Sequence, residues 1–466
     1  MLSPARALTI TLALMLMQAA VSSAANETLQ NRILTPIGPP TAPVSLKVPA
    51  TVENYLNSGK ARPLPSLPIR TWVTFSDFVH LVEEDNLALA AQRYNVSIAD
   101  AHLTAAYVYP DPTLQGGYIG DINEDQSTGY NGQVTATLVL GGRLRYGVQA
   151  ARANLEASRA GLADYIRTLR GQAADAFIDA LTGRLKLERD IKSLQRAQQL
   201  VEFNAQALGQ KQASQDALMR SRIAAAEAYS NLANDQSALH QTLGNLAVFM
   251  GTRRREGLIG AEGSLERPVR TFSLEELVEK AVTSRTDVVA AQYNLDSAIA
   301  SYHQAKAQRI PDLAVSGVYN HFTRITNPID PAPPWNSAGV LFSVPLPFSD
   351  LNKGAVAAAY YTQLQAEKTL QATRLQAEDD VRTAYEQYTL AIEQTELFGA
   401  ELLKDSDQSN KQRLFRLEKG LATLTDVLDS HAALDQLYTD YYNALSNRAK
   451  ALVALEQAAG IWDLNF

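Results

Sequence analysis

The sequence contains no cysteine, which excludes disulfide bonds and also excludes a lipid anchor on an N-terminal cysteine. Beyond the first 25 residues it has no apolar run of about 18 or more residues, as a membrane-spanning helix would require. The chain starts with a basic residue, Arg6, an apolar stretch from Ala7 to Met17 and two Ser-x-Ala triplets before Asn26. These features predict a signal peptide over residues 1–25, and any membrane crossing by the mature chain is expected to use β-strands.

Clustered positive charge is missing too. The formal net charge is −7, and the longest basic stretch, Arg253-Arg254-Arg255, is too short for the basic surface that nucleic acid requires. The sequence also lacks a phosphate-binding glycine loop, a nucleophile elbow and a His-Glu-x-x-His motif. The acidic run Glu378-Asp379-Asp380 points in several directions on an expected helix, so we interpret it as a solvated face. We therefore predict no enzymatic activity, no cofactor and no nucleic-acid partner.

Histidine and methionine offer no metal site. No two of the six histidines have ligand spacing on one helix face, and Met219 and Met250 are the methionines that remain beyond the signal peptide. His431 and Asp435, four residues apart, could bind a cation together, but such pairs more often lie on a solvated helix surface. We predict no bound metal.

Proline is concentrated in one segment and absent from two long ones. Eight prolines fall between Pro36 and Pro68, which predicts an extended N-terminal segment over residues 26–72. Residues 113–267 and 348–466 contain none, so both tracts can be nearly continuous helix. Leu155, Leu162 and Leu169 recur every seventh residue, as in a coiled coil, and the same spacing resumes further on at Leu187, Leu194, Val201 and Leu208. The helix expected over about residues 143–208 would be roughly 100 Å long.

The chain repeats itself after about 200 residues. Thr74-Phe75-Ser76 returns as Thr271-Phe272-Ser273, and Ala90-Ala91-Gln92 returns as Ala290-Ala291-Gln292. Pro112-Thr113-Leu114 is followed later by Pro311-Asp312-Leu313, and each opens a short apolar run. We predict a first repeat over residues 73–252, a linker over 253–270 and a second repeat over 271–466.

Each repeat is expected to contain one strand hairpin, with strands over about 113–119 and 133–140 in the first and about 313–321 and 338–346 in the second. Such lengths match tilted strands that cross a bilayer. Two hairpins leave unpaired edges, so closure in lipid would need other copies. Three chains would give about twelve strands, and a tetramer stays possible. A soluble helical bundle carrying two hairpins is the alternative.

From about Val73 onward the sequence closely resembles the TolC family of outer-membrane efflux proteins. The sharpest match is the run Gly420-Leu421-Ala422-Thr423-Leu424-Thr425-Asp426-Val427-Leu428-Asp429, which resembles the periplasmic tip of these channels. The resemblance implies a mainly α fold with a small β part, built as a duplicated helix-hairpin-helix. It also implies a homotrimer in which a β-barrel of about twelve strands in the outer membrane sits on a long periplasmic α-helical barrel.

The resemblance also implies roles for individual residues. Asp426 and Asp429 would form acidic rings that constrict the channel, although a solvated acidic helix face is the alternative. Gly209, Asp216, Gly420, Leu421 and Thr423 would belong to the tip that docks a periplasmic adaptor. Some family members lock this tip with a Tyr and an Arg at positions that here hold Leu417 and Ala422, so that lock is missing.

The joints between strands and long helices resemble the heavy-metal efflux branch of the family. The first joint contains Gly141 and Gly142, and the second contains Pro345 and Pro347. Glycines permit a sharp turn, and prolines end strand pairing. The same joints could also be alike for structural reasons alone.

The resemblance predicts a passive exit duct for small molecules or metal cations in the outer membrane. It would work with a periplasmic adaptor and, through it, an inner-membrane transporter. Two alternatives are the outer-membrane channel of a type I protein secretion system and a periplasmic coiled-coil adaptor or scaffold.

Overall fold

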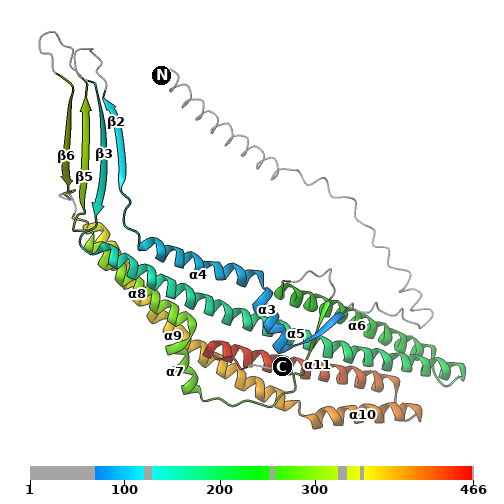
Figure 1. Cartoon of the computed structure of the whole chain (residues 1–466). Coiled ribbons are helices and arrows are strands. Elements are labelled where there is room, and N and C mark those ends of the chain that lie inside the picture. The colour runs from blue at the N-terminus through cyan, green and yellow to red at the C-terminus, as the bar shows by residue number, and fades with distance from the viewer. Residues whose placement is uncertain (1–68, 120–127, 252–257, 324–332, 347–350, 464–466) are drawn as a thin grey trace. The chain divides into compact units, whose positions relative to one another are not determined.

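The computed structural model describes residues 69–119, 128–251, 258–323, 333–346 and 351–463 (Figure 1). It is mainly helical with a small β part, as predicted, and two halves repeat one order of elements, except that α9 and α10 of the second half stand where the first half has α5. The first half contains β1 (Ile69–Thr74), α3 (Phe75–Asp85), α4 (Leu87–Ala106), β2 (Thr113–Ile119), β3 (Gly129–Leu138), α5 (Arg143–Gly209) and α6 (Gln215–Phe249). The second contains β4 (Leu258–Glu262), α7 (Leu274–Ser284), α8 (Thr286–Ala307), β5 (Leu313–Phe322), β6 (Trp335–Ser343), α9 (Lys353–Leu397), α10 (Ala400–Glu418) and α11 (Leu424–Ala459).

The two hairpins lie side by side in one antiparallel sheet, in the order β2-β3-β5-β6. Two strands begin earlier than expected. β3 begins at Gly129 instead of 133, and β6 begins at Trp335 instead of 338. Gly129 and Trp335 both pair with Phe322, so the ladder continues past the alternating apolar residues. β6 ends at Ser343 instead of 346, since Pro345 has no N–H to donate to the ladder.

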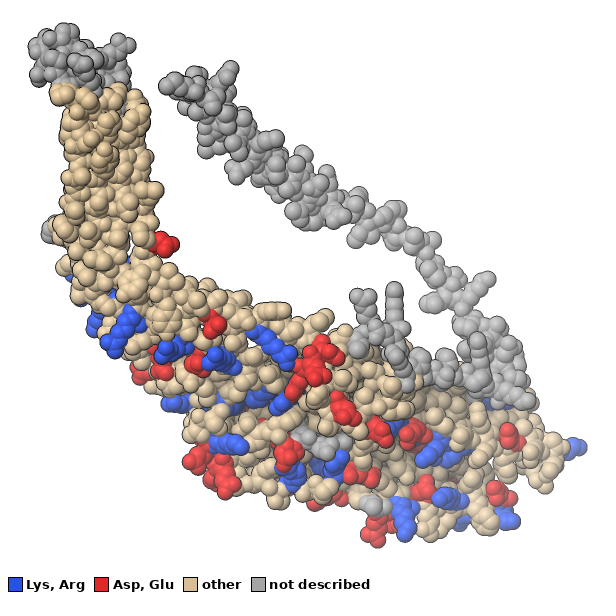
Figure 2. Space-filling view, in the orientation of Figure 1, with Lys and Arg blue, Asp and Glu red and all other residues tan. Residues whose placement is uncertain are grey.

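The sheet has one apolar and one polar face, because side chains alternate along a strand and paired residues share a face. By the observed register, the apolar face carries exposed Leu114, Tyr118, Tyr130, Val134, Leu138, Tyr319, Val340 and Phe342, with the hydrogen-bonded pair His321 and Asn336 at one end. The polar face carries Gln115, Asn131, Gln133, Thr135, Thr137, Ser316, Asn320, Ser337 and Ser343, beside some apolar residues such as Leu341. The four strands contain no Asp, Glu, Lys or Arg, and charged side chains gather over the helices instead (Figure 2).

The long helix α5 has 67 residues and passes most of the other helices. Along its predicted heptad positions Leu155, Leu169 and Leu194 are buried. It packs against α4 and α8 on the side of the sheet, and against α6 and α11 toward its other end (Figure 1). The repeating leucines are thus buried against neighbouring helices of the same chain.

Two apolar clusters hold the helices together. The larger one surrounds Phe177 of α5, which stacks edge-on with Phe75 and contacts Phe78 of α3. The smaller one joins α7, α9 and α11 around Val381 and Leu455. One cluster therefore belongs mainly to each half.

A short parallel pair, β1 with β4, corrects two sequence predictions. β1 begins at Ile69, inside the segment predicted to be extended up to residue 72, and β4 lies inside the predicted linker over 253–270. Leu258 and Ala261 are buried in the larger cluster, which accounts for the strand pairing there. The segment between the repeats is therefore partly folded into the first repeat.

The structure also corrects how the repeats align. Helices α3 and α7 begin and end 199 residues apart, with Thr74 and Ser273 as N-caps. The same offset aligns Tyr94-Asn95 with Tyr293-Asn294. The echoes at Thr74-Phe75-Ser76 and Ala90-Ala91-Gln92 have offsets of 197 and 200, so they do not mark equivalent positions. Beyond the hairpins, α5 and α9 begin 210 residues apart.

Candidate functional site

The predicted tip is a turn between α10 and α11. The chain leaves α10 at Glu418, passes through Gly420 with φ +69°, and enters α11 at its N-cap Thr423. The Thr423 hydroxyl accepts from the N–H of Asp426 (3.2 Å), while the Asp426 carboxylate accepts from the N–H of Thr423 (3.0 Å). This reciprocal capping box fixes the start of α11.

The turn between α5 and α6 has the same geometry. Ser214 is the N-cap and accepts from the N–H of Ala217 (3.1 Å), and its backbone angles match those of Thr423. The positive φ belongs to Lys211 (+59°), which is therefore the counterpart of Gly420. Gly209, expected in the turn, is instead the last residue of α5.

The two predicted gate residues lie in different surroundings. Asp426 is bound to Thr423, and hydrogen bonds from the hydroxyl and backbone N–H of Thr423 hold the pKa of Asp426 below its ordinary value. Asp429, one turn further along α11, is exposed and lines a groove between α11, α5 and α6. In the first tip, Asp216 binds Arg220 at 2.9 Å.

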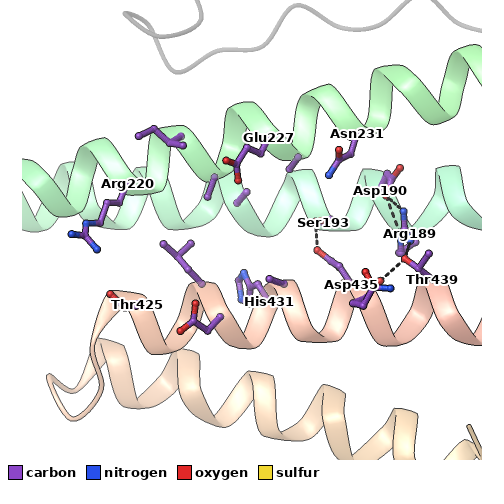
Figure 3. Close-up of a pocket in the computed structure, with 18 residues that line it drawn as sticks. Arg189, Asp190, Ser193, Arg220, Glu227, Asn231, Thr425, His431, Asp435 and Thr439 are labelled. Carbon is purple, nitrogen blue, oxygen red and sulfur yellow. Dashed lines mark hydrogen bonds and ion pairs between the residues drawn. The ribbon is translucent and has the colours of Figure 1, made fainter.

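Polar contacts link α5 to α11 at this groove (Figure 3). The Asp435 carboxylate accepts hydrogen bonds from Arg196 and Ser193, and Arg189 donates to the Thr439 hydroxyl. Both oxygens of the Asp435 carboxylate thus bind side chains of α5, and Asp435 does not form the expected surface pair with His431. Burial, followed by the positive charge of Arg196, lowers the pKa of His431.

Asp190 of α5 is a buried acid beside the groove. Burial raises its pKa from 3.8 to about 6, against the opposing effect of the Arg189 guanidinium that binds it. Asp235 of α6 adds a second negative charge nearby and raises the pKa further. The folded chain therefore holds the Asp190 proton more firmly than the unfolded chain does.

This difference predicts a pH dependence of stability. As pH rises from about 4 to about 6, the unfolded chain releases the Asp190 proton first, so the free energy of unfolding falls and stays lower above pH 6. This fall should be absent in Asp190→Asn. The free energy of unfolding of the variant should therefore rise relative to that of the wild type between about pH 4 and about pH 6. Urea unfolding of the purified protein, followed by circular dichroism at several pH values, measures it. Parallel pH profiles for both proteins would contradict the prediction.

The joints between sheet and helices turn sharply, as predicted. Gly141 and Gly142 have φ of +71° and +77°, and a Cβ on Gly141 would lie 2.8 Å from the carbonyl oxygen of Ala307. The turn ends β3 at Leu138, two residues before the expected 140. Arg143 and the N–H of Leu140 bind Asp312 at the base of β5 (2.6 and 3.1 Å).

At the second joint the corresponding positive φ values belong to Leu351 (+48°) and Asn352 (+56°), which sequence reasoning missed. The Asn352 side chain donates to the carbonyl oxygen of Ala305 at 3.0 Å and fastens the turn to α8. Asparagine tolerates this conformation better than most residues, so Asn352 was the signal in the sequence that could have indicated this turn. Pro345 follows β6, and Pro347 lies outside the described residues.

An ion pair network around a buried arginine joins three helices of the second half. The Arg285 guanidinium, at the start of α8, binds both oxygens of Asp287 (2.8 Å each) and one oxygen of Asp380 on α9 (2.9 Å). It also donates to the carbonyl oxygen of Ala458 on α11. The sequence suggested a purely solvated face for Asp380. The structure corrects this interpretation, because Asp380 binds the buried Arg285.

Residues 277–461 match the sequence model of the outer membrane efflux protein family. The match lies within the second repeat and confirms, for this part of the chain, the resemblance found in the sequence. It supports a channel component of the outer membrane and not an enzyme.

Solved channels share the fold of this chain. CusC is 16% identical and covers 86% of this chain and 99% of its own, with a TM-score of 0.69. OprN is 17% identical over 91% of this chain and 97% of its own, also at 0.69. The open state of MtrE from Neisseria gonorrhoeae is 17% identical over 86% and 94%, at 0.68. A comparison with curated proteins gives no match.

None of the helices described is both long enough and apolar enough to span a bilayer. No group of three or more metal-ligating side chains occurs in the described segments.

Proposed function

We propose that three copies of this chain close into one duct, the outer-membrane exit of a tripartite efflux system for small molecules or metal cations. The observation that carries the proposal is a two-faced sheet with open edges: among the described strands, β2 and β6 each have a neighbour on one side only. Unpaired backbone groups are costly in lipid, so both edges need further strands. Three copies supply about twelve strands, enough to close a barrel.

In such a ring the apolar face would meet lipid and the polar face would line the water-filled exit. The polar face offers hydroxyl and amide groups and no charge, with Thr135 and Ser316 in contact across β3 and β5 (2.8 Å). A lining of this kind suits passive passage of varied solutes and leaves the choice of cargo to the inner-membrane transporter.

The proposed cargo rests on the joints. Gly141, Gly142 and Pro345, together with Pro347, resemble the heavy-metal branch of the family. Export of metal cations or small molecules is therefore favoured over secretion of proteins. Loss of metal or drug tolerance on deletion, with protein secretion intact, would support this choice, and the reverse result would favour type I secretion.

The proposed adaptor site is the exposed pair of turns at the far end of the helices. Leu421 is 70% exposed, and it lies between Gly420 and the cap Thr423. The first turn, from Gly209 to Asp216, has the same backbone geometry and can therefore be bound in the same way. A periplasmic adaptor would recognise this repeated turn.

The assembly is tested by extracting outer membranes in mild detergent and weighing the purified particle by light scattering. A mass of three chains is expected. Four chains would replace the trimer by a tetramer, and a soluble single chain in the periplasm would favour the adaptor or scaffold alternative.

The acidic gate gives a separate prediction. Replacing Asp429 by Asn should raise conductance and weaken cation preference in planar bilayers, because the ring would lose its negative charge where the aperture is narrow. Asp426→Asn would also disturb the capping box with Thr423, so Asp429→Asn isolates the charge effect. Asp216→Asn, an exposed acid of the other tip, is the matched control. Unchanged current and reversal potential for Asp429→Asn would refute its place in the gate.

A further inference from the structure

Each half of the chain bends at one buried polar residue between its first two helices. Asn86 lies between α3 and α4, and Arg285 lies between α7 and α8. Their backbone angles are similar, with φ and ψ of −67° and 116° at Asn86 and of −62° and 135° at Arg285. Asn86 is 8% exposed and Arg285 is 3% exposed. The repeat therefore places two different polar side chains at equivalent buried positions.

Both side chains donate to the end of a returning helix, which is α6 or α11, the helix that runs back from the tip of the same half. The Asn86 amide donates to the carbonyl oxygen of Phe249, the last residue of α6, at 2.9 Å. The Arg285 guanidinium donates to the carbonyl oxygen of Ala458, in the last turn of α11, at 3.3 Å. The same kind of contact thus fastens the bend to the returning helix in both halves.

The ends of the two returning helices also match. Each carbonyl group that accepts these hydrogen bonds lies two residues before a glycine with positive φ, Gly251 (+65°) or Gly460 (+67°). A Cβ on Gly251 would overlap the carbonyl oxygen of Asp85, and a Cβ on Gly460 would lie 3.6 Å from the Cα of Arg285. Both helix ends therefore lie directly against the bend of their own half.

The long helices α5 and α9 are tied to the same bends, with the charges reversed. In the first half the Arg170 guanidinium of α5 binds Glu83, three residues before Asn86. In the second half the Asp380 carboxylate of α9 binds Arg285 itself at 2.9 Å. Arg170 and Asp380 are 210 residues apart, as are the first residues of α5 and α9. Each bend therefore holds a long helix and a returning helix at one place.

We infer that Asn86 and Arg285 are positioning residues of the two tips: each holds the end of a returning helix and so sets how far its tip reaches. Helices α6 and α11 contain no proline and are unbroken over 35 and 36 residues, so a shift at one end is carried to the other. Asp429 lies 29 residues before Ala458 on α11, about 44 Å away. The effect on the aperture rests on the proposed acidic gate, whereas the fastening of the helix ends does not.

Two conservative variants test the fastening. Asn86→Ser keeps an oxygen that can cap α4 but is too short to reach Phe249. Arg285→Lys keeps the charge but loses the planar fork that binds several partners at once. Hydrogen exchange of the purified full-length protein is followed by mass spectrometry. We expect exchange to rise about two- to tenfold in the last turns of α6 for Asn86→Ser and of α11 for Arg285→Lys, which is the effect of one lost hydrogen bond.

Matched controls use the same substitutions at exposed positions. Asn234→Ser lies on α6 and Arg382→Lys lies on α9, and neither residue contacts a bend. Neither control should change exchange at the ends of α6 or α11. Unchanged exchange at both helix ends in Asn86→Ser and Arg285→Lys would overturn the inference.

Bilayer currents separate positioning of the tip from local stability. Arg285→Lys should shift the conductance beyond the spread of the controls, because Asp429 lies on the helix that Arg285 fastens. Faster exchange at the end of α11 with unchanged conductance would overturn the role in positioning, and the proposed channel would stand. A wild-type particle that does not conduct would contradict the proposed function, while the exchange data would still decide whether the bends fasten the helices.

Discussion

Replacing Val134 by Arg should prevent stable assembly in the outer membrane. Val134 is 51% exposed on the apolar face of the sheet, in the middle of β3, where its side chain would meet lipid. An arginine on the lipid face near the bilayer midplane costs about 2–4 kcal/mol per copy. A ring of copies would bear this cost at each equivalent position. The measurement is the amount of detergent-stable particle recovered from outer membranes.

The neighbouring residue provides the control. Gln133 lies next to Val134 on the same strand but on the polar face, so Gln133→Arg places the same charge toward the water-filled exit. We expect this variant to assemble normally and to shift the selectivity of bilayer currents toward anions. If both variants assembled equally well, the assignment of lipid and water faces would be wrong.

Replacing Arg285 by Met should strongly destabilise the periplasmic helices. The Arg285 side chain is 3% exposed and satisfies Asp287, Asp380 and a carbonyl oxygen of α11. Removing one partner of a fully buried ion pair typically costs about 3–5 kcal/mol, and because Asp287 and Asp380 are 25% and 38% exposed, we expect a cost toward the lower end. The pKa of Asp287 supports this: burial alone would raise it, but the hydrogen bonds and charge of Arg285 hold it below its ordinary value. The midpoint of urea unfolding, followed by helical circular dichroism, should fall markedly.

Arg382→Met is the matched control. Arg382 is 51% exposed and pairs with Glu378 four residues earlier on α9, at 2.9 Å. Exposed pairs of this kind contribute about 0.3–0.5 kcal/mol, so little change is expected. Equal shifts for Arg285→Met and Arg382→Met would show that the network around Arg285 does not hold α8, α9 and α11 together.

The sequence predicted the helices and hairpins because their signals are local. Absence of proline, heptad leucines and alternating apolar runs reflect the periods of helix and strand, and α5 begins and ends within a residue or so of the predicted helix. Strand ends were less certain, since pairing with Phe322 extends β3 and β6 beyond their apolar runs. The β1–β4 pair escaped prediction because its strands lie far apart in the sequence.

For the candidate site too, local features could be predicted from the sequence and tertiary contacts could not. The second tip was found because Gly420, Thr423 and Asp426 form a local turn and capping motif. The first tip was misaligned, since a lysine occupies the position with positive φ and only backbone geometry identifies Lys211 as the counterpart of Gly420. The contact of Arg196 with Asp435, and the burial of Arg285, depend on helices that are distant in the sequence.

By itself, the sequence determined that this is a duplicated, cysteine-free, mainly helical chain with two hairpins and a family tip motif. Periodicity, composition and short motifs are local properties that can be identified without knowledge of the fold. Only the tertiary structure decided which residues of the two halves are equivalent, which face of the sheet is mainly apolar, and which helices surround Arg285. These properties depend on register and on neighbours far along the chain, and a shift of one or two residues changes the face that every side chain occupies.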